Sequence, residues 1–359
     1  MLTTTIFCLI TCGLSATIAR WMRDHAHRLR LIQAVDRRSS HARPTPTAGG
    51  AAIVISATIF LMAQSCIDNS QWPAIPIITL IALTLAIVGF IDDRGNVSFK
   101  IRLFVQGIAV AAFLLYFGAS LGATFKLTPG TLAAGALILL SGMWWINLFN
   151  FMDGIDGIAA VEALFLLVTG ALMTSWAKYD GAVHPLSIAM LLIAFAVFGF
   201  LVFNWAPARI FMGDTGSTWL AFMIFALALY TTAAAPLTLY TWCILGAAFI
   251  TDATVTLAVR LFRRERLPEA HRSHAYQRLA RLWGENRTRG HRIVTLLFAV
   301  INLCWLTPFA VLTVIYPNWS AFWAAIAYLP LIIGALLIGA GLPDHVPPPF
   351  KETLFKETR

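Results

Sequence analysis

Charged residues are scarce in this chain of 359 residues. Asp, Glu, Lys and Arg make up 12% of it, whereas a soluble domain is usually about a quarter charged. Hydrophobic residues reach 59%, and the mean hydropathy is +0.76. So few polar side chains cannot cover a water-soluble body of this size, which excludes a cytosolic enzyme, a disordered chain and a disulfide-rich secreted module. The composition predicts a polytopic membrane protein.

Cysteine is also scarce and scattered. The five cysteines lie mostly inside apolar runs, at Cys8, Cys12, Cys66, Cys243 and Cys304. Their odd number and wide spacing match neither a disulfide framework nor the ligand spacing of a metal site. We expect them to be small core or lipid-facing residues.

Apolar runs long enough to cross a bilayer recur along the chain. A helix that crosses about 30 Å of hydrocarbon needs about 20 mostly apolar residues. Eleven segments meet this requirement: 1–21, 47–67, 74–91, 101–117, 130–149, 158–177, 185–203, 217–232, 236–259, 293–316 and 320–341. Met1 to Ile18 contains no Lys or Arg, so the first segment lacks the basic region of a cleavable signal peptide and is expected to persist as an anchor. We therefore expect an all-α polytopic membrane protein of about eleven transmembrane helices, with one integral membrane domain over 1–341 and a tail over 342–359.

Basic residues are nearly absent from every second connection between these spans. The connections 68–73, 118–129, 178–184, 233–235 and 317–319 contain only Lys126 and Lys178. The remaining Lys and Arg lie in or beside the other connections and the tail, namely 22–46, 92–100, 150–157, 204–216, 260–292 and 342–359. By the positive-inside rule this second set is cytoplasmic, the N-terminus lies outside and the C-terminus lies inside. Topology thus accounts for the net charge of +9, and no nucleic-acid partner is expected.

Acidic residues are scarcer than basic ones, 17 against 26, yet they cluster in three connections that should be cytoplasmic. The first cluster is Asp92 and Asp93, where an apolar helix runs into two adjacent carboxylates, with Lys100 a few residues further on. Neighbouring like charges repel unless a cation compensates them. The pair suits divalent-cation binding or general-base chemistry, whereas a helix cap or an interfacial residue is the plain alternative for any single acid.

The second cluster crowds Asn150, Asp153 and Asp156 into the stretch Asn-Phe-Met-Asp-Gly-Ile-Asp-Gly. The glycine after each Asp favours a turn and lets another group approach the backbone closely. Oxygen ligands with no His or Cys beside them favour a hard ion such as Mg²⁺, with Mn²⁺ as the alternative.

The third cluster is Asp214 within Phe-Met-Gly-Asp-Thr-Gly-Ser, where a glycine turn opens a span. Thr215 or Ser217 would cap this helix in the structural interpretation. In the functional interpretation, the helix N-terminus receives a phosphate while Asp214 holds the metal.

The long connection 260–292 combines Arg, His and Tyr side chains. His271 and His274 are close in sequence, but no further Cys or His completes a zinc site. Guanidinium groups such as Arg272, beside His and Tyr276, suit a pyrophosphate or a nucleotide. A loop that only sets the topology is the alternative for its outer arginines.

In this order, these motifs resemble the polyprenyl-phosphate N-acetylhexosamine-1-phosphate transferase family. That family includes bacterial enzymes that initiate O-antigen and other envelope glycans, the peptidoglycan translocase I and eukaryotic dolichyl-phosphate relatives. The resemblance runs from about residue 36 to residue 278, includes the stretch around His41, and with eleven spans suits the bacterial glycan-initiating branch. It departs in one motif, because the family's His-x-His-His cluster aligns with His274-Ala275-Tyr276-Gln277 and keeps only the first His. That departure suggests a different sugar, such as a 6-deoxy N-acetylhexosamine.

The resemblance implies a Mg²⁺-dependent enzyme of the bacterial inner membrane with its active site on the cytoplasmic face. It would transfer an N-acetylhexosamine 1-phosphate from a UDP-sugar to undecaprenyl phosphate, release UMP, and initiate O-antigen or related envelope-glycan synthesis. Asp214 is the implied metal ligand with Asp156 as the second contributor, and catalytic roles fall to Asp92, Asp93 and Asp156. Substrate contacts are implied for His41, Lys100, Asn150, Asp153, Arg272 and His274. A homodimer is a further hypothesis.

An ion-coupled transporter is the rival interpretation, because acids near spans also serve pumps. Transporter acids are expected near the bilayer midplane, ideally in pseudo-symmetric broken helices. The clustered acids here sit at span ends on one side, and no half-to-half symmetry is visible. Asp252, inside the span 236–259, is the exception, and the sequence leaves its role open.

Overall fold

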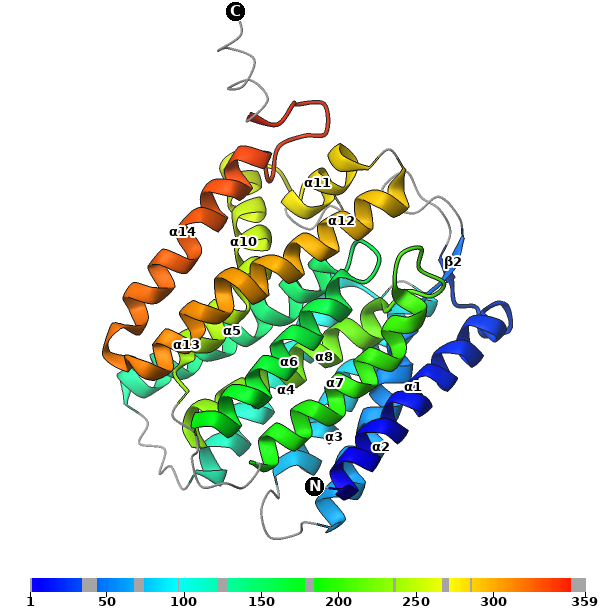
Figure 1. Ribbon diagram of the computed structural model, residues 1–359, viewed down its shortest axis with the longest axis vertical. Helices are drawn as coiled ribbons and strands as arrows, with labels where there is room; N and C mark the ends of the chain where they lie inside the picture. Colours follow the sequence, from blue (N-terminus) through cyan, green and yellow to red (C-terminus); the bar gives the residue numbers. More distant parts are fainter. Residues whose placement is uncertain are drawn as a thin grey trace, which may run out of the picture.

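The structure is a computed structural model that describes residues 2–33, 44–67, 74–95, 97–121, 128–177, 184–234, 237–266, 271–284 and 286–349. In these ranges it is a bundle of helices (Figure 1). Two strands, β1 (Ile32–Gln33) and β2 (Thr45–Pro46), form a short antiparallel ladder. Residues 34–43, including His41, lie between them and outside the described residues.

Eight long helices account for the first eight expected spans. They are α1 (Leu2–Leu29), α2 (Gly50–Ile67), α3 (Ala74–Arg94), α4 (Phe99–Ser120), α5 (Pro129–Met152), α6 (Ile158–Ala177), α7 (Pro185–Asn204) and α8 (Gly213–Ala234). Local signals start several of them. Ser98 caps α4. Thr128 caps α5 in a capping box with Thr131, and Pro129 is the first residue of that helix. Their helical surfaces are apolar almost all round, as expected of segments that meet lipid or other helices on every side.

The ninth expected span is a bent pair of helices. α9 (Leu239–Leu245) and α10 (Ala247–Phe262) meet at Gly246, where their axes differ by 74°. α12 (Arg287–Val300), a π-helical turn (Ile301–Leu306) and α13 (Thr307–Ile315) form the tenth span, and α14 (Ser320–Ile338) follows a 3₁₀ turn (Pro317–Trp319) as the eleventh. Within the described ranges, ten helices are long and apolar enough to cross a membrane, or eleven spans with the bent pair. This confirms the prediction of an all-α polytopic membrane protein.

One helix that the sequence analysis did not anticipate interrupts the last long connection. α11 (Ala275–Trp283) is short and amphipathic, and it buries Tyr276 and Leu279. It packs against α12 and α14 rather than spanning the bundle. The connection expected to be one basic loop therefore contains a short helix packed against the end of the bundle.

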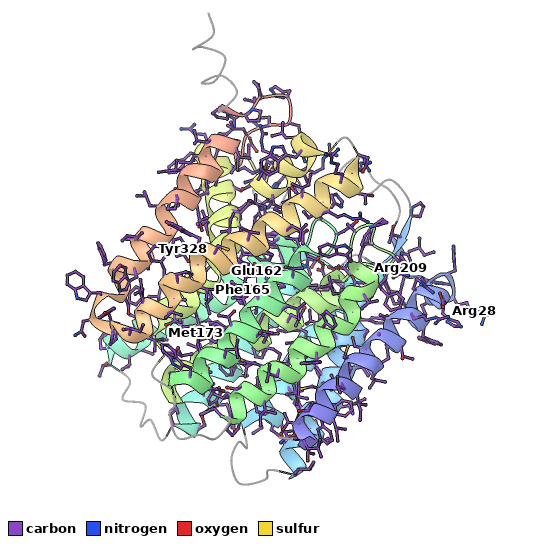
Figure 2. All side chains as sticks on the ribbon, viewed as in Figure 1. Arg28, Glu162, Phe165, Met173, Arg209 and Tyr328 are labelled. Atoms are coloured by element: carbon purple, nitrogen blue, oxygen red, sulfur yellow. The ribbon has the colours of Figure 1, made fainter. Side chains whose placement is uncertain are left out.

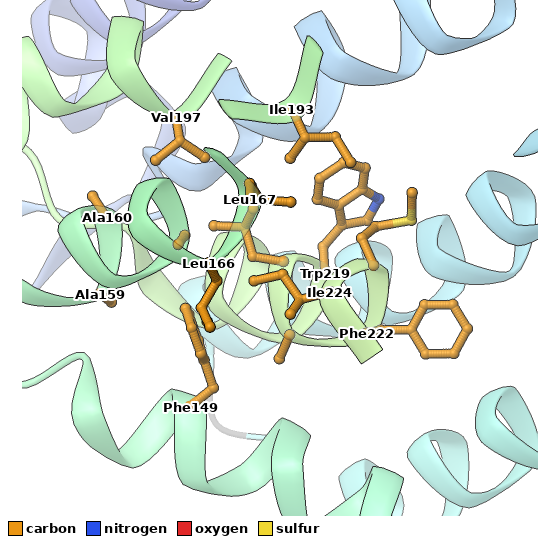
Figure 3. Packing of buried hydrophobic residues seen from close by; sticks show 14 of the residues in the cluster. Phe149, Ala159, Ala160, Leu166, Leu167, Ile193, Val197, Trp219, Phe222 and Ile224 are labelled. Carbon is orange, nitrogen blue, oxygen red and sulfur yellow. The ribbon is translucent and has the colours of Figure 1, made fainter. Parts of the chain in front are cut away.

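The bundle is centred on α6 and α8, which are the most buried spans. Figure 3 shows Phe149 of α5, Leu166 of α6 and Trp219 of α8 meeting in this core. α8 also packs closely against α3. Because α3 and α5 end, and α8 begins, at one of the acidic motifs, this packing determines how those motifs approach one another.

A buried acid lies in this core away from the motifs. Glu162 of α6 lies inside the bundle in Figure 2, and its Oε2 accepts a hydrogen bond of 2.6 Å from Asn302 Nδ2. Asn302 belongs to the π-helical turn, so the local widening of that helix coincides with a polar contact in the interior.

The connections predicted to be cytoplasmic meet at one end of the bundle. In Figure 1 the ends of α1, α5 and α7, the helix α11 and the chain beyond α14 all lie there, whereas α1 begins at the opposite end. Hydrogen bonds and ion pairs described below join several of these connections to one another.

Candidate active site

Asp93 joins α3 to the beginning of α8. Its Oδ1 accepts a hydrogen bond from the backbone N–H of Asp214 at 3.0 Å, and its Oδ2 accepts from the N–H and the hydroxyl of Thr215 at 3.0 and 2.6 Å. Thr47 adds a longer hydroxyl contact of 3.4 Å to Oδ1. Asp93 therefore caps α8 from a different helix. These two N–H groups of the helix terminus are therefore already bonded to a carboxylate in this structure.

Arg102, in the first turns of α4, lies between two of the acids. Its Nη1 lies 2.7 Å from Asp92 Oδ2 and 2.5 Å from Asp214 Oδ2. Asp92 also accepts a hydrogen bond of 2.7 Å from the N–H of Val97. Sequence reasoning counted Arg102 only among the basic residues beside a cytoplasmic connection, although a cation at the start of an apolar span was a usable signal.

Asn150, in the last turn of α5, holds the other side of Asp214. Its Nδ2 donates to Asp214 Oδ1 and to Ser217 Oγ, both at 2.9 Å. Arg102 on α4 and Asn150 on α5 thus each hold one carboxylate oxygen of Asp214. The structure brings together Asp92, Asp93, Asn150 and Asp214, as the sequence motifs led us to expect.

Asp153 follows α5 directly and lies near the same cluster. Burial, together with the carboxylates of Asp214, Asp93 and Asp156, holds the pKa of Asp153 well above its usual range. Burial is the largest cause of the shift, and the three neighbouring carboxylates add to it.

Asp156 is held by different elements from the other acids. Its Oδ2 accepts a hydrogen bond of 3.0 Å from the N–H of Ala208 and lies 3.3 Å from His291 Nδ1. Thr295 donates to its backbone carbonyl at 3.1 Å. Asp156 therefore ties the connection after α7 to α12, and His291 is a neighbour that sequence reasoning did not single out.

The other predicted substrate contacts are divided between the cavity and the surface. His274 lines the cavity described below, whereas Arg272 Nη2 lies 3.2 Å from Asp344 Oδ2 in the chain beyond α14. Lys100 is exposed in the first turn of α4. The prediction for His41 falls outside the described residues.

A cavity of about 830 Å³ opens beside Arg102, between α4, α5, α10 and residues 271–277. The apolar side chains that line it are Phe99, Leu103, Leu140, Met143, Trp144, Phe151 and Leu257. The polar side chains that line it are Arg102, Asn147, Asn150, His271, His274 and Gln277. A cavity lined by both apolar and polar side chains suits a ligand that has both a lipid and a charged part.

Tyr276 and Gln277, which the resemblance aligns with two histidines of the family, lie in different surroundings. Tyr276 is fully buried, and its hydroxyl donates to the carbonyl of Phe151 at 2.9 Å. Gln277 hydrogen-bonds to Tyr276 through its side chain, while its Oε1 is buried without a hydrogen-bond partner. A buried acceptor at a cavity wall is suited to a donor group of a ligand.

The donor set fits a divalent cation bound together with phosphates. No three His, Cys, Asp or Glu side chains among the described residues already surround a single point. Mg²⁺ commonly keeps several waters and takes only one or two carboxylates plus substrate phosphates. The clustered carboxylates can supply the negative charge that such an ion requires, and a bound cation would oppose the burial and the neighbouring charges that raise the pKa of Asp153.

Comparisons with known proteins agree with this site. Residues 75–232 match the family model described as glycosyl transferase family 4. A probable undecaprenyl-phosphate N-acetylglucosaminyl 1-phosphate transferase of Bacillus subtilis (strain 168) is 31% identical over 264 residues, which are 69% of this chain and 70% of that protein. A decaprenyl-phosphate N-acetylglucosaminephosphotransferase of Mycolicibacterium smegmatis is 29% identical over 251 residues, 63% of this chain and 60% of the relative. A phospho-N-acetylmuramoyl-pentapeptide-transferase of Rhodococcus jostii (strain RHA1) is 31% identical over 268 residues, 62% of this chain and 73% of the relative.

The chain therefore belongs to the glycosyl transferase family 4 of polyprenyl-phosphate N-acetylhexosamine-1-phosphate transferases, as its motifs predicted. The matched region runs from α3 through α8 and contains Asp92, Asp93, Asn150 and Asp214. The segment 271–277 lies beyond the region that the family model covers.

Proposed function

We propose that this protein transfers an N-acetylhexosamine 1-phosphate, or its 6-deoxy counterpart, from a UDP-sugar to undecaprenyl phosphate. The observation that carries the proposal is the juxtaposition of the acid cluster around Arg102 with a cavity lined by both apolar and polar side chains. Related proteins named for the same kind of transfer support it. We further propose that the reaction takes place at the cytoplasmic face of a bacterial inner membrane and initiates O-antigen or related envelope-glycan synthesis.

The reaction joins two phosphorylated reactants. An oxygen of the lipid phosphate attacks the β-phosphorus of the UDP-sugar, a new P–O bond forms, and the bond from that phosphorus to the bridging oxygen breaks as UMP leaves. Both reactants are anionic, so the main demand on the site is to offset charge and to align the reacting oxygen. The apolar side chains that α4 and α5 contribute to the cavity would hold the polyprenyl chain, and its polar side chains would contact the phosphates.

Named side chains meet these demands. Arg102 faces the cavity and supplies a guanidinium that can pair with phosphate oxygens. Asp92, held by Arg102 and by Val97, would orient the lipid phosphate or accept a proton from it. Asn150 holds Asp214 in place, and His274 and Gln277 would contact the sugar or its pyrophosphate.

A divalent ion, Mg²⁺ with Mn²⁺ as the alternative, would be held by Asp214 and would offset the charge of the two phosphates. Asp156 stays the predicted second ligand of the metal ion, although its carboxylate already accepts a hydrogen bond from the N–H of Ala208. Asp93 would act indirectly, because its hydrogen bonds hold the first turn of α8 and hence Asp214.

The test is a transfer assay with the purified protein in detergent, Mg²⁺, undecaprenyl phosphate and a panel of radiolabelled UDP-N-acetylhexosamines. We expect a lipid-linked sugar pyrophosphate and an equal amount of UMP with at least one donor, and the panel identifies the sugar. Asp214→Asn should abolish both products, whereas the matched variant Asp24→Asn, at an exposed carboxylate near the end of α1, should retain them. Absence of both products with every donor would contradict the proposal.

A further inference from the structure

Asp252 is an acid inside a membrane-spanning element, and it caps a helix that it does not belong to. It lies on α10 and is 3% exposed. Its Oδ1 accepts a hydrogen bond from the N–H of Ala275 at 3.0 Å, and its Oδ2 accepts from the N–H of Tyr276 at 2.8 Å. These two groups open α11, whose own N-cap residue provides no side-chain hydrogen bond. Asp252 thus supplies the cap from α10.

The same carboxylate also contacts His274. Oδ1 of Asp252 lies 3.2 Å from Nδ1 of His274, and both side chains are almost fully buried. Each oxygen of Asp252 already accepts from a backbone N–H, and Thr256 adds its hydroxyl to Oδ1 at 3.2 Å. Because an ionised carboxylate can only accept, Nδ1 of His274 must be the donor. In the neutral ring the proton then resides on Nδ1, which leaves Nε2 as an acceptor.

The ring of His274 is held on its faces as well as at this edge. His271 stacks on it with the ring centroids 4.9 Å apart and the planes 26° apart, and Phe151 approaches with its centroid at 6.4 Å. Burial and the nearby His274 lower the pKa of His271 to about 3, so the stacked partner is neutral. With Nδ1 turned to Asp252, the ring has its Nε2 edge left to present to the cavity, where His274 forms part of the wall.

We propose that Asp252 is a positioning residue that holds His274 in the Nδ1–H tautomer with Nε2 presented to the substrate cavity. There Nε2 accepts a hydrogen bond from a donor of the bound nucleotide sugar, such as a hydroxyl. The inference rests on the proposed function for the identity of that ligand. Carboxylates that orient a His through its other ring nitrogen act in this way in other sites.

The first test reads the tautomer directly and requires no activity. Selective ¹⁵N-labelling of His in the intact protein, with His274→Ala used to assign the resonance, reports which ring nitrogen carries the proton. We expect His274 to carry it on Nδ1, and we expect Asp252→Asn, whose amide can donate to Nδ1, to move it to Nε2. A neutral His274 with its proton on Nε2 in the unaltered protein would overturn the inference, whether or not any variant folds.

The second test is a double-mutant cycle on transfer activity. We expect Asp252→Asn to lower kcat about tenfold to a hundredfold, as loss of an orienting partner typically does. In the His274→Ala background, the same change should cost less than about twofold, because its effect passes through the ring. Independent, multiplying effects would overturn the inference and leave Asp252 as a helix cap alone. An inactive unaltered protein would instead contradict the proposed function, and the tautomer experiment would still decide this inference.

Discussion

Nη1 of Arg102 lies 2.5 Å from Oδ2 of Asp214, although the two residues are 112 positions apart in the sequence. The same nitrogen contacts Asp92 at 2.7 Å, so one guanidinium joins α4 to the acidic ends of α3 and α8. The pair stands at the wall of the cavity, where a phosphate can compete with the carboxylates for the cation. Arg102 is therefore both a structural bridge and a positive charge at the wall of the cavity.

A comparison of Arg102 with another arginine of the same membrane face tests whether Arg102 has a specific role in transfer. We expect Arg102→Ala to lower kcat/KM by about a hundredfold to a thousandfold, because it removes a charge that offsets the transferring phosphates. Arg102→Lys should recover part of the loss, since Lys keeps the charge but not the planar fork. The matched change Arg94→Ala, at an exposed residue ending α3, should alter kcat/KM by less than about twofold. Equal effects at the two positions would contradict the assignment.

Asp93 is expected to act on stability as well as on turnover. Asp93→Ala removes the acceptor for two N–H groups and one hydroxyl at the start of α8, so the free energy of unfolding should fall by about 1–2 kcal/mol. Thermal unfolding in detergent measures the change, with Asp24→Ala as the control for loss of an exposed carboxylate. An unchanged midpoint would show that α8 is capped by something else.

Asp92 provides a test of whether the reaction needs a general base. A lipid phosphate is already largely ionised near neutral pH, so removal of a proton should contribute little. We expect Asp92→Asn to lower kcat by less than about a hundredfold, within the range set by loss of an orienting group. Near-normal turnover would rule out a base role for Asp92, and a loss beyond that range would favour one.

Metal dependence should be traceable to Asp214. We expect a chelator to abolish transfer, and added Mg²⁺ to restore it in the unaltered protein, with Mn²⁺ as a partial substitute. Asp214→Glu should raise the Mg²⁺ concentration required for half-maximal activity, because the longer side chain displaces the carboxylate from the hold of Asn150 and Arg102. Titration of initial rates with free Mg²⁺ gives both values. Full activity in the presence of the chelator would contradict the metal proposal.

Gln277 should influence recognition of the donor more than of the lipid. Gln277→Leu keeps the volume of the side chain but removes the buried Oε1, which has no hydrogen-bond partner among the described residues. If this oxygen accepts from the sugar, KM for the UDP-sugar should rise about tenfold while KM for undecaprenyl phosphate stays the same. Gln64→Leu, at the other end of the bundle on α2, is the control. A rise confined to the lipid KM would place Gln277 on the acceptor side of the cavity.

Much of this architecture was predictable because it depends on local composition. A run of about 20 apolar residues is long enough to cross a bilayer, whatever its neighbours do. Each of the eleven expected spans therefore corresponds to a helix or a broken helix, although α1 runs on to Leu29 and α12 begins already at Arg287. The acidic motifs were equally visible, since acids are rare in such a chain and Asp92, Asp153 and Asp214 interrupt otherwise apolar sequence.

The connections were less predictable than the spans. The basic segment 260–292 contains the amphipathic helix α11, whose start is capped by Asp252 from a different helix. Arg272, expected to contact substrate, forms an ion pair with Asp344 beyond α14. Both outcomes depend on where α10 and α14 lie in space, which a local pattern does not contain.

By itself, the sequence determined that this protein is a helical membrane protein of its family and which short motifs carry its acids. Only the tertiary structure decided what each acid does: Asp93 caps α8, Asp156 ties a loop to α12, and Asp214 is held between Arg102 and Asn150. The physical reason is the distance along the chain over which each effect acts. Apolar length and composition act within a segment, whereas hydrogen bonds and ion pairs act over a few ångströms between groups that the packing of distant helices brings together.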